Sequence, residues 1–342
     1  MNNSIRYSSL ENLEEYVLNL GEKKFRAKQL YDWVFKRGIT SYDDISNLPK
    51  SLINSLRNDF ALPNIKIKDI QIDDEDDSKK YLLELDDKAC IEAVLMPHID
   101  DNSSSICLST QVGCPINCSF CATGKQGFTR NLSFDEFVSQ FLIIKNYCDR
   151  ISNIVIMGQG EPFLNYDNVV NAMHFFNASE CVNIGARKIT VSTSGLIEGI
   201  KKFTNIEEQY RLAVSLHSCD QITREQIMPI AKNNNLKDLK KVLIEYNEKT
   251  NRRVTLEYLL LQHINESVED AKKLVKFCEG LNCNVNILDY NEVPGVEFKA
   301  VDKHSKQRFI DYLTSNGLNV ACRTSRGKNI AGACGQLANT HK

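Results

Sequence analysis

Three closely spaced cysteines give this chain its clearest chemical signature. Cys114, Cys118 and Cys121 stand in a C-x₃-C-x₂-C spacing on one uncharged loop. With 12 cysteines among 342 residues, chance predicts roughly 0.015 occurrences of that spacing. Three thiolates on one loop can bind three irons of a four-iron cluster and leave the fourth iron open to another ligand. Zinc is the alternative, although structural zinc sites usually take four ligands in paired C-x₂₋₄-C arrangements.

A glycine-rich segment that ends in a carboxylate forms a second candidate site. The residues Gly158-Gln159-Gly160-Glu161 directly follow the apolar run 151–157, which reads as a β-strand. Glycine lets the backbone approach a ligand closely, and a glutamate carboxylate suits an ammonium group. A lone G-x-G-E pattern is weak, but its position in register after the cysteine loop strengthens it.

The elements that must position these residues alternate between strands and helices. The expected strands are 104–110, 151–157, 188–193, 210–216, 253–260, 284–289 and 318–322, with helices between them at 167–177, 196–203, 236–249, 268–280 and 303–315 and one that starts at Ser133. Six strand–helix units require a parallel sheet with helical crossovers and fall short of the eight in a closed barrel. The sequence therefore predicts an α/β fold, an open partial (β/α) barrel, with its polar and glycine-rich segments at one rim.

Three regions divide the chain. Residues 1–62 are expected to form a small helical domain, and 63–97 a linker with a β-hairpin from strands 81–85 and 90–96. The acidic run 73–77 reads as a solvated turn or linker. The catalytic barrel is expected to fill 98–342.

Overall charge excludes a globally basic nucleic-acid binder, because 42 Lys and Arg face 44 Asp and Glu. The stretch 23–37 nevertheless mixes six basic residues with four aromatics, which favours a local RNA-contacting patch over a solvated amphipathic helix with core aromatics. Further basic residues expected around the mouth are Lys125, Arg130, Arg323, Arg326 and Lys328.

The N-terminus lacks a signal-peptide pattern, so we expect a cytosolic protein without a membrane partner. We also expect a monomer.

The cysteine loop after the first barrel strand and the segment that ends in Glu161 resemble the radical S-adenosylmethionine superfamily. Further motifs narrow the resemblance to the RlmN-type RNA adenine-C2 methyltransferases over nearly the whole chain. These motifs are Gln111–Gly113, Cys121–Phe128, Ser192–Gly195, Ser215–His217 and Ala333–Leu337.

This resemblance implies a [4Fe-4S] cluster held by Cys114, Cys118 and Cys121, and S-adenosylmethionine on its open iron. Positions that correspond to the family's cofactor contacts are Gly160, Glu161, Ser192, Ser215, Leu216, His217 and Asn291. Taken singly, each of these residues is as readily explained by a structural role, such as a turn serine, a helix cap or a core histidine whose hydrogen bonds are satisfied.

The resemblance also assigns the carbon-transfer chemistry. Cys334 would be the methyl carrier: one S-adenosylmethionine methylates its sulfur, and a radical from a second activates that methyl group. Cys107 would then resolve the protein–RNA bond by forming a disulfide with Cys334. Glu92 would be the proton acceptor. From the residues alone, Cys107 reads more readily as a buried core thiol, and strand alternation would place Glu92 on the solvent face.

The implied substrates are an adenosine in the peptidyl-transferase region of 23S rRNA and the adenosine next to the tRNA anticodon, with an unidentified one-electron donor as a further partner. The nearest alternative is the Cfr-type activity, which methylates C8 of the same rRNA adenine. Other classes are a non-catalytic iron–sulfur or zinc RNA-binding module, and a radical activase for a protein substrate.

Overall fold

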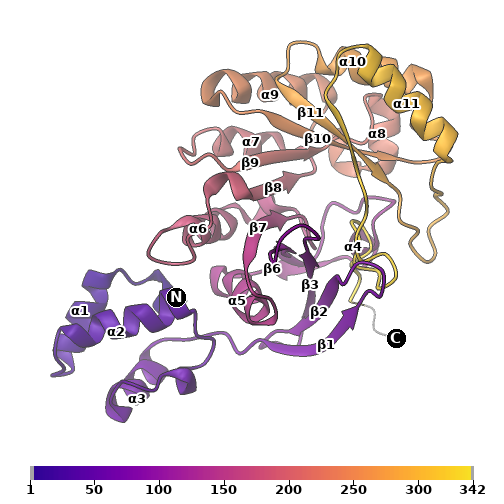
Figure 1. Ribbon diagram of the computed structural model, residues 1–342. Coiled ribbons are helices and arrows are strands. Elements are labelled where there is room, and N and C mark those ends of the chain that lie inside the picture. Colours follow the sequence, from indigo (N-terminus) through magenta and orange to yellow (C-terminus); the bar gives the residue numbers. More distant parts are fainter. Residues whose placement is uncertain (1–3, 340–342) are drawn as a thin grey trace.

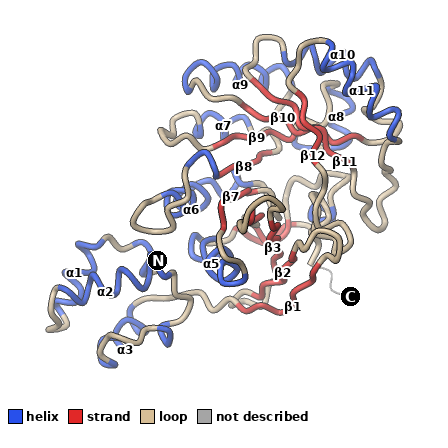
Figure 2. Tube along the Cα trace, viewed as in Figure 1, coloured by secondary structure: helices blue, strands red, loops and turns tan. Residues whose placement is uncertain are grey.

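A ten-stranded mixed sheet forms the centre of the molecule, as seen in a computed structural model that describes residues 4–339 (Figures 1 and 2). Its strand order is β1-β2-β3-β4-β7-β8-β9-β10-β11-β12, and every pair from β4 to β12 is parallel. The parallel strands are β4 (Ser104–Cys107), β7 (Ile151–Ile156), β8 (Ile189–Thr193), β9 (Arg211–Ser215), β10 (Val254–Leu260), β11 (Cys283–Asp289) and β12 (Val320–Arg323). The first and last strands do not pair, so the sheet is an open partial barrel, as the strand–helix count predicts.

Crossover helices cover the outer face of this sheet (Figure 1). They are α5 (Phe134–Ile144), α6 (Tyr166–Asn177), α7 (Ile197–Phe203), α9 (Leu236–Thr250), α10 (Val268–Cys278) and α11 (Lys303–Ser315), with the short α8 (Gln221–Ile227) between β9 and α9. Side-chain caps begin several of them; at α5, Ser133 and Glu136 form the capping box that their spacing predicts. The crossovers make the strands run in one direction, so their carboxyl ends share one rim.

The predicted hairpin is present as β2 and β3, but the rest of 63–97 is more than a linker, since a further strand joins the hairpin in the sheet. Strands β1 (Lys66–Ile72), β2 (Lys79–Glu84) and β3 (Cys90–Pro97) form an antiparallel meander, and β3 pairs antiparallel with β4. The strand β1 was not predicted because its sequence, KIKDIQI, does not alternate regularly between apolar and polar residues. The structure has a register shift at the same place, between Ile67 and Asp69.

The acidic run 73–77 is not simply a solvated turn. Asp73 is 2% exposed, and Asp76 accepts a hydrogen bond from the main-chain N–H of Gly327, far away in the sequence. Asp74 and Asp77 do face solvent. The charge pattern of residues 73–77 alone therefore does not show that this turn contacts a distant part of the chain.

The N-terminal helices share one hydrophobic core with the barrel, and in this region Tyr7 contacts Phe134 of α5 and Phe35 contacts Phe175 of α6. The helices are α1 (Leu10–Asn19), α2 (Phe25–Tyr31), a π-helical turn over Asp32–Arg37 and α3 (Lys50–Asp59). Gly38, with φ +67°, ends the π-helical turn that continues α2, in the left-handed conformation that glycine adopts readily. Among the described residues, no helix is long and apolar enough to cross a membrane.

A buried arginine fastens this N-terminal region to the barrel. Arg6 Nη1 lies 3.1 Å from Asp135 Oδ1 on α5 and donates to Ser139 Oγ at 3.1 Å, and Arg6 Nη2 donates to the Ile39 carbonyl at 2.8 Å. The Arg6 side chain is fully buried, so these partners replace its lost hydration.

Removing this cation should therefore strand a buried carboxylate. We expect Arg6→Met to lower the free energy of unfolding by about 3–5 kcal/mol, measured by urea denaturation. The exposed pair Arg57–Asp43 provides the control, and Arg57→Met should cost at most about 1 kcal/mol. Equal losses in the two variants would contradict the anchoring role of Arg6.

Candidate active site

A cavity of about 460 Å³ lies at the carboxyl ends of the parallel strands. Side chains from the cysteine loop, from the ends of β4, β7, β8, β9, β10 and β11, and from the C-terminal segment line it. Segments predicted to meet at one rim of the sheet therefore line a common cavity.

The cysteine loop forms one wall of the cavity. It is braced by the two-stranded ribbon of β5 (Gln111–Gly113) and β6 (Phe128–Asn131) and by α4 (Ala122–Lys125). A Cβ on Gly113 would lie 1.9 Å from the carbonyl oxygen of Gly127, so glycine is required where the loop leaves the ribbon. Cys114, Cys118 and Cys121 all line the cavity.

Burial raises the pKa of the Cys114 thiol to about 12 and shifts the pKa of Cys118 well upward. The protein alone therefore keeps these sulfurs neutral, whereas bound iron would deprotonate them and compensate the buried charge. Within residues 4–339, no set of three or more Cys, His, Asp or Glu side chains is arranged around a single metal ion. In a cluster, each of the three thiolates would bind a separate iron.

The second wall contains the segment that ends in Glu161. Gly160 has φ +106°, and a Cβ there would lie 2.6 Å from Thr110 Oγ1. The Glu161 carboxylate is buried and accepts from Ser194 N and Thr193 Oγ1, each at 2.7 Å, and from Phe163 N at 3.1 Å. Burial raises the pKa of Glu161, although these hydrogen bonds favour its ionised form. A cationic amino group is the ligand that such a buried carboxylate suits.

The other predicted cofactor contacts divide into two groups. Ser192, Ser215 and His217 line the cavity together with Gly160 and Glu161. Leu216 and Asn291 do not: Leu216 is buried, and Asn291 Nδ2 donates to Ser325 Oγ, which itself lines the cavity.

His217 is a neutral hydrogen-bond donor in this arrangement. Burial lowers the pKa of its imidazole to about 3, so the ring is uncharged at neutral pH. Nδ1 accepts from the Leu259 N–H at 3.1 Å, which leaves the proton on Nε2. The ring of Phe120 stands edge-on to the imidazole and fixes its plane.

Two buried charged residues near the site were not predicted. Arg224 on α8 is fully buried and donates to the carbonyls of Ser194 at 2.7 Å and Leu216 at 3.1 Å, so it ties together the loops after β8 and β9. Glu257 on β10 lines the cavity and accepts from Asn286 Nδ2 at 3.0 Å. A glutamate inside the apolar strand VTLEYLL is a signal that could have identified Glu257.

The C-terminal segment covers the remaining side of the cavity (Figure 1). Two contacts fasten it to the helix after the cysteine loop: Ala122 N donates to the Gly335 carbonyl at 2.7 Å, and Thr123 Oγ1 to the Leu337 carbonyl at 2.6 Å. Cys334 is exposed, as its small neighbours predict, and it lines the same cavity as Cys107 at the end of β4. All twelve cysteines lie within residues 4–339, and none is in a disulfide there.

Glu92 is fully buried, so the alternative that placed it on the solvent face is wrong. β3 is covered on both sides, and simple alternation therefore fails. Glu92 Oε1 lies 3.1 Å from Lys80 Nζ, and Oε2 accepts from Ala338 N at 2.8 Å and Asn339 N at 3.1 Å. The carboxylate thus lies behind the C-terminal segment and does not line the cavity.

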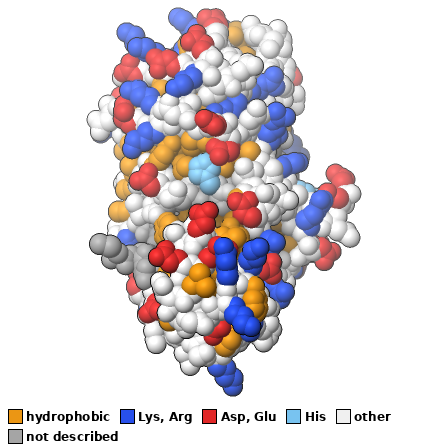
Figure 3. Space-filling model, turned by 90° about the vertical axis from the view of Figure 1, so that its left-hand side faces the viewer, with side chains coloured by type: hydrophobic (Ala, Val, Ile, Leu, Met, Phe, Trp, Pro, Cys, Tyr) orange, Lys and Arg blue, Asp and Glu red, His pale blue; other side chains and the backbone are white. Residues whose placement is uncertain are grey.

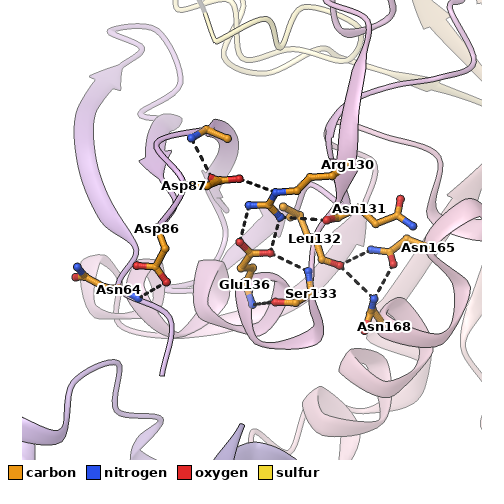
Figure 4. A network of polar contacts seen from close by, with 11 residues as sticks. Asn64, Asp86, Asp87, Arg130, Asn131, Leu132, Ser133, Glu136, Asn165 and Asn168 are labelled. Atoms are coloured by element: carbon orange, nitrogen blue, oxygen red, sulfur yellow. Dashed lines mark hydrogen bonds and ion pairs between the residues drawn. The ribbon is translucent and has the colours of Figure 1, made fainter. Parts of the chain in front are cut away.

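Arg130, expected among the RNA-contacting residues, is committed to an internal network instead (Figure 4). Its guanidinium donates to Asp87 at 2.7 Å and to both oxygens of Glu136 at 2.8 and 2.9 Å. These two carboxylates raise the pKa of Arg130, which shows how fully its charge is compensated.

The other basic residues expected at the mouth differ in their surroundings. Lys125 Nζ donates to the Gly295 carbonyl, and Arg326 donates to the carbonyl of Pro97 and lines the cavity. Lys328 is exposed, and the side chain of Arg323 lies outside the described part of the chain.

The basic N-terminal stretch presents charge but few aromatic rings. Lys23, Lys24 and Lys28 are exposed, whereas Trp33 and Phe35 belong to the core. The remaining aromatic residues of the stretch are Phe25, which is 49% exposed, and the half-buried Tyr31. Figure 3 shows this side of the molecule, on which basic side chains alternate with acidic and hydrophobic ones.

Comparison with known proteins agrees with this architecture. A family model described as the radical SAM superfamily matches residues 108–278, and one described as the ribosomal RNA large subunit methyltransferase N-terminal domain matches residues 7–62. The crystal structure of a radical SAM methyltransferase from Sphaerobacter thermophilus superimposes with a TM-score of 0.91 at 35% identity, over 98% of both chains. The fold and site therefore define a radical SAM methyltransferase.

Curated relatives then specify the family. The chain is 42% identical to a probable dual-specificity RNA methyltransferase RlmN from Syntrophomonas wolfei subsp. wolfei, over 97% of this chain and 96% of the relative. It is 40% identical to one of the same description from Staphylococcus aureus, over 98% and 91%. The chain belongs to the RlmN family of radical SAM RNA methyltransferases, which use a [4Fe-4S] cluster and S-adenosylmethionine.

The steric fit of Gly160 gives a test of the cofactor wall. Gly160→Ala should weaken S-adenosylmethionine binding by at least about tenfold, because its Cβ would displace the segment that carries Glu161. Equilibrium dialysis with anaerobically reconstituted protein measures this. Gly185→Ala is the control, since nothing lies within 4 Å of its Cβ. Unchanged affinity in the Gly160 variant would show that the segment does not bind the cofactor.

Proposed function

We propose that this enzyme methylates C2 of adenosine in RNA and uses Cys334 as the methyl carrier. One observation carries the proposal: Cys107 and Cys334, distant in sequence, line the same cavity as the three cysteines of the cluster loop. A binding module would need the cluster loop but not two further thiols beside it.

Cys114, Cys118 and Cys121 would hold the cluster, and Glu161 would bind the amino group of S-adenosylmethionine. Ser192, Ser215 and His217 would complete the cofactor wall, with Nε2–H of His217 as a donor. Gly160 would allow close approach of the backbone, and Leu216 and Asn291 would act through their neighbours, Arg224 and Ser325. Bound there, the cluster and cofactor supply a methyl group and an organic radical.

The thiols of the chain would then carry the carbon. The Cys334 thiol gives up its proton and takes a methyl group on its sulfur. The radical then removes one hydrogen atom from this methyl group, and the remaining carbon bonds to C2 of adenine. The adduct then passes one electron to a one-electron carrier protein and its C2 proton to a base, which restores the aromatic ring. Attack of Cys107 on the Cys334 sulfur then breaks the sulfur–carbon bond, and the released carbon takes up a proton to become the methyl group. The resulting Cys107–Cys334 disulfide returns to two thiols through an external dithiol reductant.

Glu92 is the proposed acceptor of the C2 proton. It is a buried carboxylate one β-strand away from Cys107, since Val94 on its own strand pairs with Cys107. Because the C-terminal segment lies between this carboxylate and the cavity, proton transfer would require that segment to shift or a water to bridge.

The proposed substrates are the peptidyl-transferase adenosine of 23S rRNA and the adenosine next to the tRNA anticodon. C2 lies on the base edge, so the adenine must leave its stack to enter the cavity. Residues 1–62 would contact the RNA, and we place the enzyme in the cytosol as a monomer served by a separate one-electron donor.

Replacement of the carrier tests the reaction. Cys334→Ala should abolish RNA methylation and leave the visible absorbance of the cluster unchanged, whereas the exposed Cys322→Ala should remain active. Mass spectrometry of nucleosides from treated rRNA and tRNA measures 2-methyladenosine. 8-Methyladenosine would instead indicate Cfr-type chemistry, and loss of absorbance would make Cys334 a cluster ligand.

Neutralising the basic N-terminal stretch tests RNA contact. Replacing Lys23, Lys24, Arg26 and Lys28 by Gln should weaken RNA binding and make its salt dependence shallower, by ~0.7 in slope for each lost contact to single-stranded phosphates. The charge-matched control replaces Lys201, Lys202, Lys241 and Lys272, which are exposed on outer helices. Filter binding at several salt concentrations measures both sets, and identical slopes would exclude this stretch from the interface.

A further inference from the structure

Two carboxylates on the turn between β1 and β2 hold the segment that leads to Cys334. Asp73 Oδ2 accepts the main-chain N–H of Asn329 at 3.0 Å, and Asp73 Oδ1 accepts Asn329 Nδ2 at 3.1 Å. Asp76 Oδ2 accepts the main-chain N–H of Gly327 at 2.9 Å. In Figure 1 the yellow C-terminal segment accordingly lies beside the purple turn between β1 and β2.

The turn is built so that these oxygens point outward. Asp73 N donates to the Ser78 carbonyl at 2.9 Å, and Asp77 N to the Asp73 carbonyl at 3.0 Å. The Oδ1 atoms of Asp73 and Asp76 accept from Glu75 N and Ser78 N, each at 3.0 Å. Oδ1 of each carboxylate therefore fixes the turn, and Oδ2 of each receives a main-chain N–H of the C-terminal segment.

Burial alone would raise the pKa of Asp76, but hydrogen bonds from Ser78 and Gly327 and the nearby Arg326 bring it below its ordinary value. Asp76 is thus ionised at neutral pH, and its contact with Gly327 is charge-assisted.

The held segment is a closed loop that precedes the carrier cysteine. Gly332 N donates to the Gly327 carbonyl at 2.8 Å, so residues 327–332 form one compact turn two residues before Cys334. Beyond Cys334, the contacts of Glu92 with Ala338 and Asn339 fix the chain again. Cys334 is therefore suspended between two carboxylate anchors, both on the β1–β3 meander.

We propose that Asp73 and Asp76 are positioning residues that latch the loop 327–332 and so fix Cys334 over the cavity. The inference rests on the proposed function for its catalytic consequence, but the latch itself is independent of that function. Without it, the chain on the N-terminal side of Cys334 would be held only through Ser325 and Arg326, further from the cysteine, and the carrier sulfur would spend less time near the cofactor and Cys107.

The test uses a double variant that preserves the turn. Asp73→Asn with Asp76→Asn keeps an oxygen for the N–H groups of Glu75 and Ser78, but places an NH₂ donor opposite the N–H groups of Asn329 and Gly327. Asp74→Asn with Asp77→Asn is the control, because it removes the same two charges from exposed positions of the same turn.

We expect hydrogen exchange of peptides covering 327–337 to become about tenfold faster in the double variant, with the barrel strands and the control unchanged. The kcat for RNA methylation should fall by about tenfold or more, with the KM for RNA within about twofold of the parent enzyme. A change in kcat alone marks positioning, because a general loss of structure would also affect barrel exchange and RNA binding.

Unchanged exchange of 327–337 would overturn the latch, and so would an increase spread equally over the barrel. Faster loop exchange with a parental kcat would overturn the positioning role. If the parent enzyme methylates no RNA, the proposed function fails, and the exchange comparison alone decides whether the latch exists.

Discussion

The buried contact between Glu92 and the C-terminal segment is the constraint on which the site depends. An open barrel leaves one side of its cavity uncovered, and the chain must return from β12 to close it. Glu92 receives that returning chain through two main-chain N–H groups, and its charge is balanced by Lys80, which is itself 2% exposed. Without either partner, a charge would remain buried and unpaired, a large cost in a folded protein. The antiparallel meander is therefore a structural part of the active site, although it lies outside the parallel barrel.

The electrostatics of the cavity favour cationic ligands. Three half-buried cysteines, the buried Glu161 and Glu257, and Asp289 line it, and the one arginine among the described residues of its lining, Arg326, donates to the Pro97 carbonyl. Arg224 is directed away from this space because its donors are occupied by the carbonyls of Ser194, Ser215, Leu216 and Asn234. A metal cluster, and a sulfonium cofactor with an ammonium group, would both balance the negative charge of this lining. In the proposed reaction the covalent chemistry falls to two sulfurs that line this same cavity, those of Cys334 and Cys107.

Sequence patterns predicted the features that depend on local order. The cysteine loop, the segment that ends in Glu161 and the six strand–helix units each depend on neighbours within about a dozen residues, and all appear in the fold. The features that sequence analysis missed depend on distant partners. Asp73 meets Asn329, and Arg224 gathers carbonyls from two other loops. Arg130 pairs with Glu136 and with the distant Asp87, and no composition count distinguishes such an arginine from one that binds RNA. Glu92 is buried because the distant C-terminal segment covers its carboxylate, a contact that the alternation of β3 alone cannot show.

The central claim is that Cys334 carries the methyl carbon to C2 and that Cys107 releases it. The most direct measurement is mass spectrometry of the Cys107→Ala enzyme after anaerobic turnover with RNA and nuclease digestion. The account predicts an adenosine joined through one carbon to the peptide that carries Cys334, with fragmentation that places the carbon on C2. An unmodified Cys334 peptide beside freely released methylated RNA would contradict it, because carbon transfer would then need neither thiol.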